Sequence, residues 1–134
     1  REELAPLLYR RCRHVITENA RVLKSMEALS RDDPAAFGRL LNASHDSLRD
    51  QYEVSCAEID LLVELAREVP GVFGARLTGG GFGGSTVNLV AAESVADFSR
   101  RVMENYRRQT GIEPKLYTSV AAGGAEVIQG GKED

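Results

Sequence analysis

The sequence has 134 residues, of which 43% are hydrophobic and 28% charged, and its formal net charge is -3 at pH 7. These values describe one ordinary globular domain, and they give no reason to expect nucleic acid or an anionic membrane as a partner. Cys12 and Cys56 lie far apart and outside any metal-ligand motif, which indicates ordinary thiols in a reducing, cytoplasmic compartment.

The first half of the sequence predicts three helices. Residues 6–30 form a long amphipathic helix, because apolar residues recur there at helical spacings: Leu8, Cys12, Val15, Ile16, Leu23 and Met26. Asp33 and Pro34 are typical of an N-cap and a first helical position, so a second helix begins there. Its expected buried stripe is Phe37, Leu40, Leu41, Ser44 and Leu48.

A capping-box pattern, Ser55-x-x-Glu58, predicts the start of the third helix, which Pro70-Gly71 ends. Its expected inner face is Ile59, Leu62, Val63 and Ala66.

The second half of the sequence changes to a strand-like period. Residues 74–77 and 86–91 are expected to be strands, and Ser94-x-x-Asp97 is expected to cap a fourth helix that Gly111 ends. The inner face of that helix is predicted to be Val95, Phe98, Val102 and Tyr106. A last strand over 116–120 and a flexible tail over 123–134 complete an α+β domain, with helices packed on a small, mainly antiparallel sheet.

The connection between the two central strands is unusually rich in glycine, with five glycines among residues 79–84. It satisfies G-x-G-x-x-G, but a strand follows where the dinucleotide fingerprint needs a helix. It also fails as a Walker-type phosphate loop, because Ser85 stands where the lysine belongs. Two interpretations stay open: a tight structural bend, or a loop whose backbone N–H groups face an anion such as a nucleotide phosphate.

Residues 74–84, G-A-R-L-T-G-G-G-F-G-G, resemble the third motif of the GHMP small-molecule kinases. Two further segments, 13–21 (R-H-V-I-T-E-N-A-R) and 44–56 (S-H-D-S-L-R-D-Q-Y-E-V-S-C), resemble the galactokinases of that family in particular. Ser85 and Ala57 replace a cysteine and a proline common in those proteins. The resemblance covers about residues 9–120 and implies a ferredoxin-like GHMP kinase C-terminal domain over residues 1–122.

The resemblance also implies an activity for a longer parent protein: phosphorylation of galactose by ATP, with Mg²⁺, to give galactose 1-phosphate. In that family the sugar-recognition motif, the serine-rich phosphate loop and the catalytic aspartate belong to an N-terminal domain. None of these lies in residues 1–134, so we expect no catalytic and no metal-binding residue here and an inactive isolated chain. Its expected partners are ATP and galactose in the complete enzyme, its own N-terminal kinase domain, and other copies of itself. The last would bind through an apolar patch around the glycine loop and the helix ends beside it, which the missing domain would otherwise cover.

The resemblance places the glycine loop at the wall of the ATP-phosphate site. The expected wall residues are Thr78, Gly79, Gly80, Gly81, Phe82, Gly83 and Gly84. We expect Phe82, the one bulky member, to anchor the loop in the core.

Other polar residues receive structural interpretations. His14 and His45 are expected to be helix histidines satisfied by neighbours. Solvated helix faces are expected for two charged groups: Asp46, Arg49, Asp50 and Glu53, and Arg10, Arg11 and Arg13. The alternative function from another class is a non-catalytic, ferredoxin-like module that binds a ligand or a protein.

Overall fold

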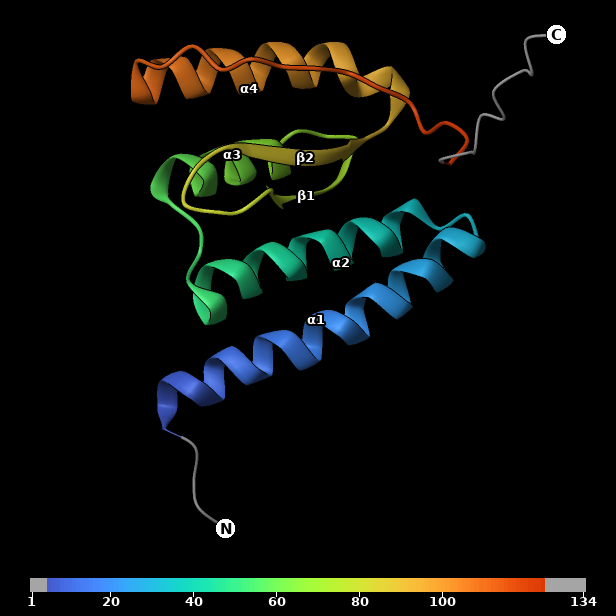
Figure 1. Cartoon of the computed structure of the whole chain (residues 1–134). Helices are drawn as coiled ribbons and strands as arrows, with labels where there is room; N and C mark the ends of the chain where they lie inside the picture. Colours follow the sequence, from blue (N-terminus) through green and yellow to red (C-terminus); the bar gives the residue numbers. More distant parts are fainter. Residues whose placement is uncertain (1–4, 125–134) are drawn as a thin grey trace, which may run out of the picture.

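The computed structural model describes residues 5–124 and arranges helices around a two-stranded antiparallel sheet (Figure 1). The elements in chain order are α1 Pro6–Ser30, α2 Pro34–Ser47, the π-helical turn η1 Leu48–Tyr52, α3 Ala57–Arg67, β1 Val72–Thr78, β2 Ser85–Val90, the 3₁₀ turn η2 Ala92–Ser94 and α4 Val95–Thr110. The predicted α+β class and the four helices are therefore confirmed. No helix in the described part of the chain combines the length and apolar character that crossing a membrane requires.

Two of the predicted helix-end residues act as expected, and two do not. Asp33 caps α2 by accepting a hydrogen bond from the Ala36 N–H at 2.8 Å, and Gly111 ends α4 with a φ of 73°. The expected capping box at Ser55 is wrong, because α3 begins after Cys56 and the Ser55 hydroxyl donates to Asp60 instead. Ser94 makes no capping bond either, since η2 already holds it in helical conformation.

The hydrophobic core lies between α3, α4 and the sheet. Its buried members are Val63, Leu65, Ala66, Val69, Ala75, Phe98, Val102 and Tyr106. The predicted inner faces of α3 and α4 are thus largely confirmed, although Leu62 and Val95 are only partly buried.

The outer edge of β1 is covered by α2 rather than by another strand (Figure 1). The Asn42 side-chain oxygen accepts from the Ala75 N–H at 2.9 Å, and His45 Nδ1 accepts from the Leu77 N–H at 3.3 Å. Asn42 and His45 are three residues apart and share a helix face, while Ala75 and Leu77 point the same way along the strand. Two side chains of α2 therefore replace the bonds that a third strand would make.

The apolar face of α1 is exposed, which the sequence did not predict. Leu8, Val15, Ile16, Leu23 and Met26 are all between 49% and 69% exposed. The side of α1 that faces α2 is polar instead: His14 contacts Ser47, and Ser44 donates a hydrogen bond to Glu18. The periodicity identified the helix, but polar contacts decide which face packs.

The expected strand over 116–120 is wrong: residues 112–124 are irregular and the sheet ends with β2. Leu116 packs against the core, but Tyr117 and Val120 are 86% and 91% exposed. The alternation of apolar residues over 116–120 resembles a strand, but this segment pairs with no strand of the sheet. The tail predicted over 123–134 lies outside the described residues except for Gly123 and Gly124.

Candidate functional site

The glycine loop joins β1 to β2 at the end of the domain where α2 passes through η1 into α3 (Figure 1). Positive φ values occur at Gly79, Gly81, Phe82, Gly83 and Gly84, between 59° and 132°. Glycine adopts this left-handed region without the steric cost that a Cβ imposes. Four of the five loop glycines therefore adopt a conformation that favours glycine, and Gly80 does not.

The loop presents backbone rather than side chains. Thr78, Gly79, Gly80, Phe82 and Gly84 are exposed, and the other two predicted wall residues are partly exposed. A Cβ added to Gly79, Gly80, Gly83 or Gly84 would meet nothing within 4 Å. Of the amides from Gly79 to Gly84, only that of Phe82 is hydrogen-bonded within the described residues. The remaining N–H groups of the loop have no hydrogen-bond partner among residues 5–124.

Phe82 anchors the loop through its backbone and not through its ring, which corrects the sequence-based expectation. Its N–H donates to the Val54 carbonyl oxygen at 2.7 Å, whereas its side chain is 75% exposed. Gly81 lies against the same residue, so closely that a Cβ would come within 2.5 Å of the Val54 oxygen.

His14 has neighbouring partners, as expected, whereas His45 is hydrogen-bonded at Nδ1 alone. His14 Nδ1 lies 2.9 Å from the Ser47 hydroxyl, and its ring stacks on Tyr52 with 4.5 Å between centroids. His45 is fully buried, with Nδ1 bonded to Leu77 and Nε2 at 3.3 Å from the Asp60 carboxylate. Burial lowers the pKa of both imidazoles, and for His45 the positive charge of Arg67 lowers the pKa further.

The charged helix residues form ion pairs at the surface. Glu53 pairs with Arg10 at 3.0 Å and Arg11 at 2.6 Å, and its pKa is lowered mainly by the hydrogen bond from Arg11. Asp50 pairs with Arg49 at 2.7 Å, while Asp46 accepts from Arg67 at 2.9 Å.

Arg10, Arg13, Asp50 and Glu53 are exposed, so the solvated-face interpretation agrees with the structure for these four. It is wrong for the half-buried residues Arg11, Asp46 and Arg49, because Arg11 and Asp46 pair with residues of other elements.

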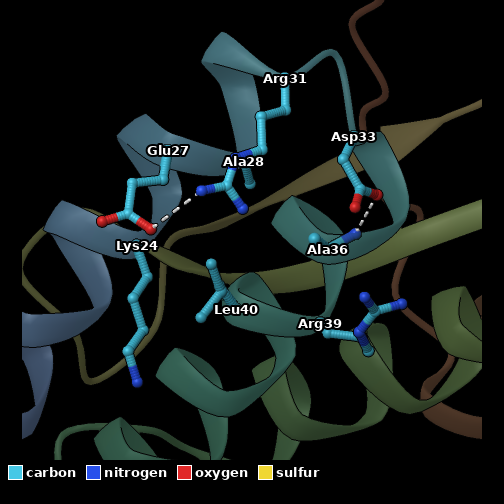
Figure 2. Close-up of a pocket in the computed structure, with 8 residues that line it drawn as sticks. All are labelled: Lys24, Glu27, Ala28, Arg31, Asp33, Ala36, Arg39 and Leu40. Carbon is cyan, nitrogen blue, oxygen red and sulfur yellow. Dashed lines mark hydrogen bonds and ion pairs between the residues drawn. The ribbon is translucent and has the colours of Figure 1, made fainter.

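A small pocket of about 260 Å³ lies between α1 and α2 near their connecting turn. Figure 2 shows Arg31 turned toward Glu27, at 4.0 Å, and Asp33 bonded to the Ala36 backbone. Lys24 and Arg39 point in different directions around Leu40 (Figure 2). Because the polar groups do not converge on one point, and the turn lies at the opposite end of α2 from the glycine loop, this pocket is not the candidate site.

A wider groove of about 640 Å³ lies beside β2. Residues 84–90, the inner face of α4 and residues 114–119 line it. Its lining is mostly apolar and it holds no cluster of titratable side chains. Within residues 5–124, no three His, Cys, Asp or Glu side chains gather as metal ligands do.

The residues that hold the loop were not identified from the sequence. Val54 bonds the loop directly, Asn42 and His45 bond the amides of β1 that precede it, and Asp60 contacts His45. Of these four, the sequence indicates a local role for His45 alone. Asn42 and His45 lie outside the stripe predicted for this helix, so no spacing in the sequence points to their contacts. The Val54 contact gives no signal either, since it uses a backbone carbonyl that every residue carries.

Comparison with known proteins assigns the fold to a family. The model of the GHMP kinases C terminal family matches residues 25–107. Galactokinase from Glaesserella parasuis is 46% identical over 128 residues, 95% of this chain and 33% of its own length. Human galactokinase is 51% identical over 120 residues, 90% of this chain and 30% of its own length.

Solved structures agree. Galactokinase from Lactococcus lactis, complexed with galactose, superposes with a TM-score of 0.78 and 42% identity, covering 81% of this chain and 28% of that one. Mevalonate kinase from L. major, in complex with R-mevalonate, gives 0.54 and 34% identity over 68% of this chain and 26% of its own. The chain thus spans about a third of the length of the curated relatives it matches.

Proposed function

Because this chain belongs to the GHMP kinase C-terminal family, we propose that it is the C-terminal part of a galactokinase, which transfers a phosphoryl group from ATP to the anomeric hydroxyl of galactose. The identities of 46% and 51% to galactokinases over nearly the whole chain support this substrate over those of other GHMP kinases. The product of the reaction is galactose 1-phosphate. We also propose a cytoplasmic location, in keeping with two free cysteines.

The observation that carries the proposal is the exposed glycine loop with its unbonded amides. Phosphoryl transfer depends on positioning and on stabilising the charge of the transferring group. Backbone N–H groups fixed in place stabilise such charge at no reorganisation cost during the reaction. We therefore assign residues 78–84 to the wall of the ATP-phosphate site, with the glycines allowing the phosphates to approach the backbone.

The remainder of the site is proposed to come from the N-terminal part of the parent enzyme. Residues 78–84 carry no acidic side chain that could bind Mg²⁺, and we propose that Mg²⁺ accompanies ATP. The exposed apolar face of α1 is proposed to contribute to docking on the other domain, because monomeric proteins rarely expose large contiguous apolar patches.

The test is complementation within a relative. The segment of human galactokinase that aligns with this chain is replaced by residues 1–134, and galactose phosphorylation is measured with ATP and Mg²⁺. We expect the chimera to turn over galactose, and both this chain alone and human galactokinase without the segment to be inactive. A chimera that unfolds cooperatively but shows no turnover would favour the interaction-module alternative. Turnover by the 134 residues alone would show that the catalytic groups lie within this chain.

A further inference from the structure

We propose that His45 and Asp60 are positioning residues for the glycine loop, holding its first and middle parts in one geometry through a chain of polar contacts. The inference deepens the proposed function and its catalytic consequence rests on it, but its structural part is independent of what the loop binds. Neither residue is proposed to touch a substrate.

The contacts form a closed circuit. The Leu77 N–H, two residues before the loop, donates to His45 Nδ1 at 3.3 Å, and His45 Nε2 faces Asp60 Oδ1 at 3.3 Å. The Ser55 hydroxyl donates to the same carboxylate at 2.5 Å. Ser55 is covalently joined to Val54, whose carbonyl oxygen accepts from the Phe82 N–H at 2.7 Å. These contacts therefore link the end of β1, at Leu77, to the middle of the loop, at Phe82.

Packing alone does not explain a histidine at position 45. The side chain is 0% exposed, and a buried polar ring costs free energy that an aliphatic side chain of similar size would not. Because Nδ1 accepts from a backbone amide, the proton must lie on Nε2, which faces the carboxylate. The Nε2 contact is not aligned as a hydrogen bond and acts as an attraction between the N–H dipole and the charge of Asp60.

The surroundings keep the ring in the form that can accept. Burial, Arg67 of α3 and Arg49 of η1 lower the pKa of His45, against the opposing effect of Asp60 and Asp46. A protonated ring would carry a hydrogen on both nitrogens and would place an N–H against the Leu77 N–H. The circuit is therefore intact only with a neutral imidazole.

The structural test uses amide hydrogen exchange of the 134-residue chain, followed residue by residue by NMR. His45→Leu removes both contacts, His45→Asn keeps an acceptor near the Nδ1 position, and Asp60→Ala breaks the circuit without touching Leu77. We expect the Leu77 amide to exchange about tenfold faster in His45→Leu, the factor that corresponds to one net hydrogen bond. In Asp60→Ala both the Leu77 and the Phe82 amides should exchange faster, because His45 and the Val54–Ser55 segment lose the carboxylate that holds them. His45→Asn is expected to restore part of the Leu77 protection.

His14→Leu is the matched control, since His14 is also a buried helix histidine with one hydroxyl partner but no contact to the loop. It should lower global stability without singling out the loop amides. If Leu77 and Phe82 exchange as in the unaltered chain, or accelerate only in step with every other amide, the positioning role is wrong. If His45→Leu does not fold, the exchange rates of Asp60→Ala and His45→Asn still test the positioning role. Both variants should fold, because alanine favours the helix at position 60 and asparagine keeps a polar side chain at position 45.

The catalytic consequence is measured in the human chimera. We expect Asp60→Ala to lower kcat about tenfold or more with little change in KM for galactose, because a displaced loop affects phosphoryl transfer and not sugar binding. An inactive chimera with the expected exchange pattern would overturn the proposed function and leave the circuit standing. An active chimera whose kcat is unaffected by Asp60→Ala would overturn the positioning role in catalysis.

Discussion

Gly38 on α2 and Gly74 on β1 bring their backbones into direct contact. A Cβ on Gly74 would lie 2.1 Å from the Gly38 carbonyl oxygen, and a Cβ on Gly38 would lie 2.1 Å from the Phe73 carbonyl oxygen. Real side chains do not approach backbone atoms this closely, so both positions require glycine. This close approach places Asn42 and His45 within reach of the β1 amides.

Gly38→Ala should destabilise the protein by about 1–3 kcal/mol or more, because the added methyl forces α2 away from β1. Chemical denaturation of the purified chain measures the change. Gly80→Ala is the control, since a Cβ there meets nothing within 4 Å and Gly80 has no positive φ. Equal stabilities of the two variants would contradict the contact between α2 and β1.

Gly81→Val should reduce turnover in the chimera far more than an exposed surface substitution. A β-branched residue at a φ of 88° costs about 1–3 kcal/mol in strain, and its Cβ would press on the Val54 carbonyl. A resulting displacement of about 1 Å in the loop can lower the rate on the order of a hundredfold. Ser85→Cys keeps a similar size at the start of β2 and should be nearly silent. If Gly81→Val lowers thermal stability but turns over normally, the loop is only a structural bend.

The stability of the chain should fall as the pH is lowered from about 7.5 to 5.5. The pKa values of His14 and His45 are lowered in the folded protein, mainly by burial, below the ordinary value of about 6.5. The unfolded chain therefore binds protons in this range before the folded chain does, and the free energy of unfolding decreases. Denaturation curves at several pH values measure this slope, which the double variant His14→Leu, His45→Leu should flatten. A free energy of unfolding that rises over the same interval would contradict buried, neutral imidazoles.

The isolated chain should self-associate through α1. Ile16 and Leu23 are 69% and 63% exposed on its apolar face, and exposed patches of this kind promote association. Sedimentation velocity over a range of concentrations should show association that Ile16→Glu or Leu23→Glu abolishes. Tyr117→Glu, at a residue 86% exposed elsewhere, should leave the association unchanged. A chain that remains monomeric at high concentration would refute the role of this face.

Local signals in the sequence predicted most of the elements but few of the contacts between them. Asp33 and Gly111 act at one helix end each, so their neighbours in the chain suffice to predict what they do. The exposed face of α1 could not be predicted from periodicity. The face that packs on α2 is the one where His14 contacts Ser47 and Glu18 accepts a hydrogen bond from Ser44. Leu116 to Val120 have a strand pattern, but a strand also needs a partner in space.

The candidate site divides in the same way. Positive φ in the glycine loop followed from composition, since that many glycines have few other uses. The hydrogen bond that holds the Phe82 amide could not be predicted from the sequence. Its acceptor is the backbone carbonyl of Val54, which any residue at position 54 would provide. Long-range polar contacts such as Leu77 with His45 carry no spacing signature in a single sequence.

The engagement of the Ala75 and Leu77 amides by Asn42 and His45 also bears on aggregation. A strand edge with unpaired amides can recruit a strand from another molecule, and proteins commonly protect such edges. Beside β1 an incoming strand would have to displace α2 and separate the glycine contact first. Substitutions that loosen α2 from β1 are therefore expected to expose these amides and to increase intermolecular strand pairing.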